Sequence, residues 1–268
     1  MESKQFYDLV DNCRKILTRN LEAKNSNLRF DFDSKIYCDG IRKDLLLVKQ
    51  YMNNGKVLDV GCGKGHISAL LSAMGFDVIG IDLNYSQGEG GIFSGDHLGR
   101  QWQRSIWQDF EKDFNVTYKF YDGIKLPFQE ESFDAVVAYA VIEHVDDANN
   151  LLEESRRVLR DNGRIFIFRC PKIYSFSENL AKLMGLGHHE KLMSEDELTE
   201  LLYKNMFEVL RIDKYDMIPA FMPIIKLQET WNSLFPMMNV LQDVLLKTPL
   251  NFFAHNIRLV AQKQGDRV

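Results

Sequence analysis

The sequence predicts an α/β fold in which helices cover both faces of a doubly wound, mostly parallel β-sheet. Short, continuously apolar runs alternate along the chain with stretches of helical length. Continuous runs are typical of parallel strands buried on both faces, and their alternation with helices is typical of doubly wound sheets. A glycine-rich turn follows the first run and leads directly into a helix, which is a common arrangement in such sheets.

The predicted elements follow in a regular order. A helix, HISALLSAM, comes after the glycine-rich turn, another covers 150–159, and a third begins at Ser194, where Glu197 completes a capping box. Residues 1–52 precede this alternation and are predicted to form an N-terminal helical cap. Because the chain contains no stretch with the composition of a linker, residues 1–268 are expected to form a single domain. The predicted strands include 56–60, 77–82, 133–140, 164–170, 207–217 and 255–263.

Composition narrows the class of partner. The 268 residues carry a net charge of −5 and contain no basic stretch, so no nucleic-acid partner is expected. No apolar run approaches the roughly 18 residues of a membrane-spanning helix, and the N-terminus lacks the apolar core of a signal peptide. The four cysteines lie far apart and form no CxxC pair. These features predict a cytoplasmic protein without a disulfide framework.

The glycine-rich turn lies in VLDVGCGKG, residues 57–65. Its GxGxG spacing differs from the GxGxxG of dinucleotide folds, and Asp59 stands within the preceding strand. A carboxylate at a strand end favours a cationic amino group and would repel a pyrophosphate. Asp82 ends the second strand about twenty residues further on, a spacing at which an acid accepts ribose hydroxyls.

Asp122 and Gly123 lie between two predicted strands. A loop carboxylate at this place can accept a hydrogen bond from an adenine amino group. The alternative is an Asx-turn beside a glycine, which the local sequence fits as well.

Four segments resemble, in order and spacing, the class I S-adenosylmethionine-dependent methyltransferases: VLDVGCGKG, GIDLN, DGIKLPFQEESFDAVVAYAVIEHVDD and LLEESRRVLRDNGRIFIF. The resemblance covers about residues 50–215 and is greatest for the small-molecule branch that includes the ubiquinone and menaquinone methyltransferases. It implies a Rossmann-like sheet of seven strands, mostly parallel with an antiparallel last strand. It also implies S-adenosylmethionine as cofactor, S-adenosylhomocysteine as product and a small-molecule acceptor.

The resemblance assigns cofactor-binding roles to particular residues. The loop from Asp59 through Gly61, Cys62, Gly63 and Gly65 would hold the methionine part. Asp82 would take the ribose hydroxyls and Leu83 would contact the adenine, with Asp122 and Gly123 at the adenine amino group. Tyr139 and Ala140, at the end of the fourth strand, would lie beside the sulfonium.

His144 is the candidate catalytic residue, as a general base or as a group that orients the acceptor. The alternative is a structural histidine that fixes its loop. Some relatives bind a divalent cation through an ExxEH pattern, but Ala140 replaces the first acid here. Glu143 and His144 alone are too few ligands, so no metal is expected.

Three further features leave their roles open. His188 and His189 line a pocket rim or cap a helix, with substrate contact as the alternative. The insertion at 85–118 places Trp102 and Trp107 on either side of Arg104, where they cover a ligand or anchor the segment on the core. The apolar helical insertion at 219–253 packs on the sheet, covers an apolar acceptor, or offers a surface for peripheral membrane or partner contact, although it lacks a basic face.

The most direct functional hypothesis is methyl transfer to a small-molecule acceptor, apolar or glycosylated. A methyltransferase that acts on protein or RNA, and a non-catalytic cofactor-binding protein, are the alternatives. A nicotinamide dehydrogenase is disfavoured by the GxGxG spacing, by Asp59 and by the Asp122 loop.

Overall fold

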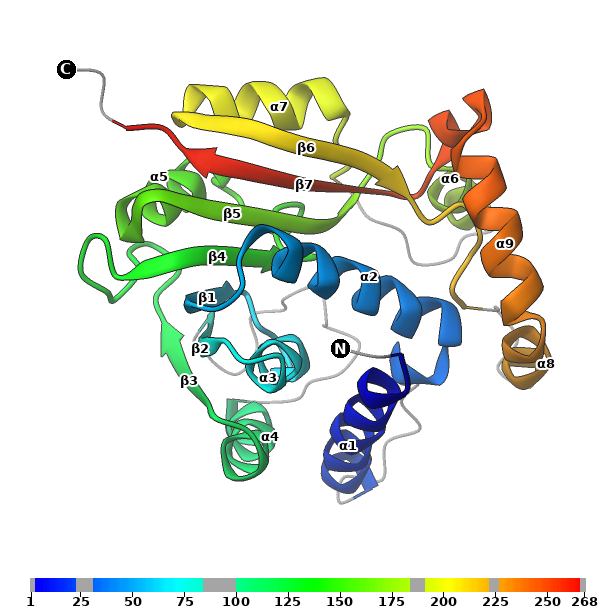
Figure 1. Cartoon of the computed structure of the whole chain (residues 1–268), viewed down its shortest axis with the longest axis horizontal. Helices are drawn as coiled ribbons and strands as arrows, with labels where there is room; N and C mark the ends of the chain where they lie inside the picture. Colours follow the sequence, from blue (N-terminus) through cyan, green and yellow to red (C-terminus); the bar gives the residue numbers. More distant parts are fainter. Residues whose placement is uncertain (1–2, 23–30, 84–99, 184–190, 222–226, 266–268) are drawn as a thin grey trace.

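The computed structural model describes residues 3–22, 31–83, 100–183, 191–221 and 227–265. Seven strands form one sheet in the order β3-β2-β1-β4-β5-β7-β6 (Figure 1). Strand β7 is antiparallel to both of its neighbours, whereas the pairs among β1 to β5 are parallel. The predicted mostly parallel sheet with an antiparallel last strand is therefore confirmed. The strands are β1 Lys56–Val60, β2 Asp77–Leu83, β3 Val116–Tyr121, β4 Phe133–Tyr139, β5 Leu159–Pro171, β6 Phe207–Tyr215 and β7 Asn256–Lys263.

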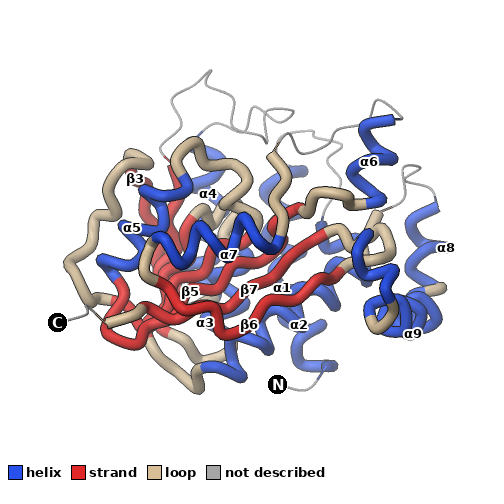
Figure 2. Tube along the Cα trace, turned by 90° about the horizontal axis from the view of Figure 1, so that it is seen from above, coloured by secondary structure: helices blue, strands red, loops and turns tan. Residues whose placement is uncertain are grey.

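Helices cover both faces of this sheet, as Figure 2 shows from above. The helices α1, α2, α3 and α4 pack on one face through one apolar core. The helices α5 and α7 pack on the other face through a second core. Successive strand residues alternate between the cores: Phe166 and Phe168 face the first, while Ile165 and Ile167 face the second. The helices on the first face are α1 Ser3–Glu22, α2 Lys35–Tyr51, α3 His66–Ala73 and α4 Arg100–Asp113; those on the second are α5 Ala148–Val158 and α7 Glu195–Lys204.

The predicted capping box at Ser194 is confirmed, because the Ser194 hydroxyl accepts the N–H of Glu197 and the Glu197 carboxylate accepts the N–H of Ser194. The interpretation of 85–118 as an insertion is wrong for the described part of this segment. Residues 100–113 form α4, which leads into β3 and is a regular crossover helix. Its apolar residues Trp102, Ile106 and Phe110 have helical spacing and are buried.

Helix α2 is tied to the carboxyl ends of β4 and β6 by a buried polar network. The Asp44 carboxylate accepts hydrogen bonds from the hydroxyls of Tyr139 (3.2 Å) and Tyr215 (3.3 Å). Its other oxygen accepts Arg258 Nη1 at 3.3 Å. Burial raises the pKa of Asp44 to about 6, and the Arg258 guanidinium partly offsets that shift. Arg169 donates to the Tyr139 hydroxyl at 2.9 Å, so β5 joins the same network.

The segment at 219–253 forms α8 Gln228–Ser233, α9 Phe235–Leu246 and the 3₁₀ helix η3 Pro249–Phe253. These lie beyond the carboxyl end of β6, near α6 Phe176–Leu183 (Figure 1). The segment is fastened to α2 and the residues before it: Asn232 Nδ2 donates to Asp33 O at 2.6 Å and Lys43 Nζ donates to Asn239 Oδ1 at 2.9 Å. The described part of the segment is therefore bonded to α2 and to the residues just before it, and we call these contacts the clasp.

Candidate active site

A cleft of about 670 Å³ opens at the carboxyl ends of β1, β2 and β4. This is where the strand order reverses, and open α/β sheets bind their ligands at such a point. Of the predicted site residues, eight line the cleft: Gly61, Gly63, Asp82, Leu83, Asp122, Gly123, Ala140 and His144. The other four, which lie just outside its lining, are Asp59, Cys62, Gly65 and Tyr139.

Hydrogen bonds to backbone atoms fix the glycine-rich turn. The N–H groups of Gly61 and Cys62 both donate to the carbonyl of Ile81 in β2, at 2.8 and 3.0 Å. The N–H of Gly63 donates to Asp82 Oδ2 at 2.6 Å. The carbonyl of Gly63 accepts Trp107 Nε1 at 3.0 Å and Gln103 Nε2 at 2.9 Å. The turn is therefore held by β2 on one side and by α4 on the other.

Asp82 is a buried carboxylate at the floor of the cleft. It accepts the N–H of Leu83 at 2.7 Å, the N–H of Gly63 and, at 3.2 Å, Gln103 Nε2. Burial raises the pKa of Asp82, and these hydrogen bonds oppose the shift. A carboxylate offers about four acceptor sites, so the three bonds leave room for one further donor. If Gln103 turns away, Asp82 can accept two further donors.

The glycines of the turn serve two different purposes. Gly63 has a φ of +53°, and a Cβ built on it meets no described atom within 4 Å, so this position borders open cleft. Gly65 has a φ of +89°, and a Cβ there would lie 2.8 Å from the Tyr118 ring. Gly63 thus leaves space for a ligand, whereas Gly65 leaves space for the core.

Asp59 lies in β1 and is buried. Its Oδ2 accepts the Ser68 hydroxyl at 2.5 Å, and its Oδ1 has no hydrogen-bond partner among the described residues. Burial raises the pKa of Asp59 to about 7; the Ser68 hydrogen bond lowers it and the charge of Asp82 raises it further. A buried carboxylate with an unsatisfied oxygen beneath the turn is suited to a nearby positive charge.

Asp122 occupies the exposed rim of the cleft. Its Oδ1 accepts the N–H groups of Ile124 (2.9 Å) and Lys125 (3.1 Å), and these bonds lower the pKa of Asp122. The Asx-turn named as the alternative is therefore present. Gly123 packs against the Leu83 side chain, since a Cβ on Gly123 would lie 2.7 Å from Leu83 Cδ2. Leu83 and Gly123 form an apolar wall suited to a flat ring.

Tyr139, the last residue of β4, and Ala140, which follows it, lie in different environments. Ala140 lines the cleft with a φ of +54°, whereas the Tyr139 hydroxyl enters the Asp44 network. His144 follows Ala140 closely in the chain and also lines the cleft. Its Nε2 lies 3.7 Å from Oε1 of the buried Glu143. His144 is the histidine that the cleft presents among the described residues.

Sequence reasoning missed Gln103. Gln103 and Trp107 are four residues apart on α4, which places both on the side that faces the turn. Trp107 also stacks on Tyr118 with ring centroids 5.2 Å apart, so it anchors α4 on the core as one of the two expected alternatives stated. The spacing of Gln103 to Trp107 was the available signal, but the contact with Gly63 depends on the folded sheet.

His188 and His189 lie outside the described residues. Within the part of the chain that the structure describes, no group of three or more His, Cys, Asp or Glu residues is arranged to hold a metal ion. None of the described helices is long and apolar enough to cross a membrane.

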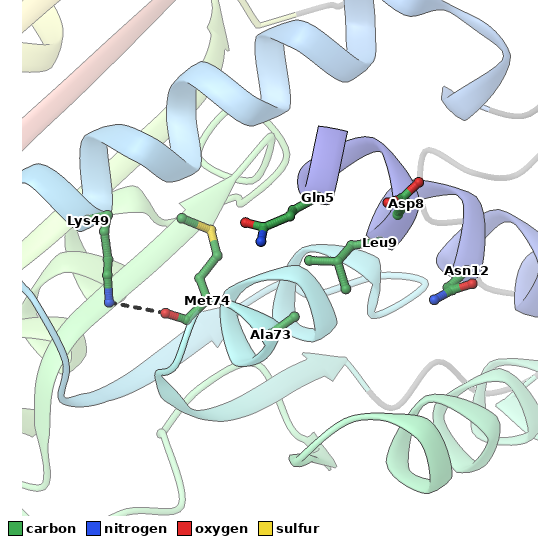
Figure 3. A pocket seen from close by; sticks show the side chains of 7 residues that line it. All are labelled: Gln5, Asp8, Leu9, Asn12, Lys49, Ala73 and Met74. Carbon is green, nitrogen blue, oxygen red and sulfur yellow. Dashed lines mark hydrogen bonds between the residues drawn. The ribbon is translucent and has the colours of Figure 1, made fainter. Parts of the chain in front are cut away.

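A second hollow, of about 470 Å³, lies between α1, α2 and α3 (Figure 3). Lys49 at its edge donates to the Met74 carbonyl at 3.1 Å. The hollow shares no lining residue with the cleft, and no predicted site residue lies in it.

Comparison with known proteins agrees with this geometry. A family model described as "Methyltransferase domain" matches residues 58–167. A ubiquinone biosynthesis O-methyltransferase from Pelagibacter ubique is 28% identical over 171 residues, which are 60% of this chain and 65% of that protein. A mitochondrial protein of the same description from Homo sapiens is 33% identical over 164 residues, 58% of this chain and 42% of that protein. The chain spans less than two thirds of the length of both relatives.

A solved structure of a SAM-dependent methyltransferase from Methanosarcina mazei superposes with a TM-score of 0.50 at 19% identity, covering 81% of this chain and 96% of that one. The sheet order is that of a Rossmann-like fold, and residues 58–167 match a methyltransferase domain. The family-model match and the O-methyltransferase descriptions of the relatives thus support a class I S-adenosylmethionine-dependent methyltransferase.

The two glycines of the turn allow a matched pair of variants. Gly63→Ala should cost only about 1–2 kcal/mol of stability, the strain of a left-handed alanine, yet weaken cofactor binding at least about tenfold. Gly65→Ala should cost a further ~1–3 kcal/mol through overpacking against Tyr118. Urea denaturation and calorimetric titration with S-adenosylhomocysteine measure both effects. Unchanged affinity in Gly63→Ala would show that the ligand does not approach this turn.

Asp59 should impose a pH dependence on stability. Its pKa is raised in the native state, so between about pH 4 and pH 7 the native state binds more protons than the unfolded state. Stability from this residue is therefore fully present at low pH and lost as pH rises through about 7. Asp59→Asn should gain stability relative to the wild type over that window, measured by denaturation at several pH values. A difference that does not vary with pH would contradict the assignment.

Proposed function

We propose that this chain transfers the methyl group of S-adenosylmethionine to an oxygen of a small-molecule acceptor. The observation that carries the proposal is the cleft at the reversal point of the sheet, where Gly63 borders open space and the Asp82 carboxylate forms the floor. The O-methyltransferase descriptions of the relatives, which match about 60% of the chain, support oxygen as the accepting atom.

The lining of the cleft fits each part of the cofactor. Asp82 accepts the ribose hydroxyls, and Gln103 gives up its bond to Asp82 when it does so. Leu83 and Gly123 contact the adenine ring, with Asp122 at its amino group. The Gly61–Gly65 turn surrounds the methionine part, and the Asp59 charge beneath the turn stabilises its ammonium group. When bound, the cofactor supplies an activated methyl carbon on a positively charged sulfur.

Catalysis then depends mainly on how the chain's own residues position the acceptor. Holding two reactants in line contributes on the order of 7–11 kcal/mol, which makes positioning the largest contribution. His144, which lines the cleft, would accept the proton that the acceptor hydroxyl loses on methylation. Ala140 and Val141 line the same cleft as His144 and the turn. The four cysteines, all free and buried, are compatible with the cytoplasmic location that we also propose.

Cofactor binding can be tested without knowing the acceptor. At 100 times its dissociation constant, S-adenosylmethionine should stabilise the protein by about 2.7 kcal/mol in a thermal-shift assay, and NAD should not. Asp82→Ala should abolish the shift, because the ribose loses its acceptor. Asp77→Ala, at the exposed opposite end of the same strand, is the matched control and should retain it. A shift that persists in Asp82→Ala would refute the ribose assignment.

The role of His144 requires a turnover measurement. Transfer of labelled methyl to a panel of hydroxylated small molecules should fall by about 10²–10⁴ in His144→Ala, while affinity for S-adenosylhomocysteine stays within about twofold. Asn150→Ala, at the rim of the same cleft, should keep most of its turnover. Equal turnover in His144→Ala would leave positioning as the sole mechanism. Label recovered in precipitated protein or RNA would instead favour a macromolecular acceptor.

A further inference from the structure

Helix α9 is apolar on the face that it turns to solvent. Met237, Val240, Leu241 and Val244, which we call the α9 stripe, are 61, 64, 47 and 54% exposed. They follow one another at helical positions i, i+3, i+4 and i+7. A helix on the surface of a globular protein normally buries such a stripe and presents polar residues outward. The α9 stripe therefore requires an explanation that the folded monomer does not supply.

The inward face of α9 is fixed by polar contacts. Gln242 is buried, and its Oε1 accepts the N–H of Ile218 at 3.3 Å. Asn239 Oδ1 accepts Lys43 Nζ of α2 at 2.9 Å. A rotation of α9 that buried the stripe would break both bonds. The outward orientation of the stripe is therefore a built feature of the chain.

Neighbouring side chains enlarge the exposed apolar surface. Leu234, which precedes α9, is 39% exposed, and η3 adds Leu250, Phe252 and Phe253 at 50, 45 and 47%. Monomeric proteins rarely expose contiguous apolar patches of more than a few hundred Å² unless the patch binds something. Stable interfaces bury about 800 Å² on each partner, so a dimer interface would extend from the stripe over these neighbouring side chains.

We propose that the α9 stripe pairs with the same stripe of a second copy of this chain, with the two helices antiparallel about a two-fold axis. The stripe is symmetric about the point between Val240 and Leu241. An axis through that point sets Met237 against the partner's Val244 and Val240 against the partner's Leu241. Each apolar position then meets an apolar position, which is the self-complementarity that a two-fold interface requires.

The charges around the stripe favour this occupant over an anionic surface. Residues 227–253 contain two acidic side chains, Glu229 and Asp243, and one basic side chain, Lys247. Amphipathic helices that lie on membranes are typically rich in Lys and Arg on their polar face, and acidic partners require the same. A nearly uncharged, symmetric stripe is instead what two identical helices bury against each other.

The mass in solution tests the pairing. At 50 µM, light scattering after size exclusion should give twice the chain mass of 31.2 kDa. Val240→Asp and Leu241→Asp should each shift the dimer to monomer, since the two-fold axis places every substitution in the interface twice. Tyr203→Asp, which alters an equally exposed side chain on α7, is the control and should remain dimeric. Thermal melts verify that each variant is folded.

Cross-linking tests the antiparallel register. The four native cysteines are buried, so engineered thiols on the stripe report alone. The double variant Met237→Cys/Val244→Cys should form a covalent dimer on mild oxidation. Met237→Cys alone should not, because seven residues at 1.5 Å each separate the two copies of position 237 along the helix axis.

Three results would overturn the proposal. The first is a wild-type protein that stays monomeric at 50 µM. The second is cross-linking of Met237→Cys alone, which would indicate parallel helices or random contact. The third is a monomer that sediments with neutral phosphatidylcholine vesicles and loses this binding in Val240→Asp, which would make the stripe a lipid-binding surface.

Discussion

The arrangement of the site depends on the hydrogen bonds of the Gly63 N–H and carbonyl groups. Its N–H is bonded to Asp82 at the end of β2, and its carbonyl is bonded to Trp107 and Gln103 of α4. One residue thus connects the first strand, the second strand and the helix that follows it. Since buried peptide groups must be paired, the chain cannot move one of these elements without unpairing another. The cleft inherits its shape from this requirement.

A second set of contacts links the cofactor side to the N-terminal helices. Ala140 lines the cleft, while the preceding residue, Tyr139, bonds to Asp44 of α2 through its hydroxyl. The end of β4 is therefore held by the buried carboxylate of Asp44, which also accepts a hydrogen bond from Arg258. Burying a charge is costly unless it is paired, so the network stabilises one arrangement of α2 over the sheet. The described part of residues 1–52 acts there as part of the helical layer, and none of it lines the cleft.

Local pattern in the sequence was sufficient for every strand except β3, for the capping box at Ser194 and for the loop that borders the cleft. It failed where the decisive partner is distant in the chain. Gln103 contacts Gly63 across forty residues, and its spacing from Trp107 indicates a shared helix face but not the partner of that face. Asp59 was expected at the cofactor-binding loop, but its hydrogen bond to Ser68 of α3 could not be read from the local sequence. The residues 100–113 were taken for part of an insertion because their tryptophans and charges obscured an ordinary crossover helix.

The clasp between α8 and the start of α2 joins segments that are remote in the chain. Asn232 and Asp33 are 199 residues apart, and Ser34 bonds to Ala220 across 186. Contacts of such separation form only after the intervening sheet is in place, because the loop they close is costly before then. The clasp should therefore be the last part of the molecule to assemble and the first to open. Amide exchange in α8 and early α2 would then proceed while the sheet, and with it the cofactor site, stays protected.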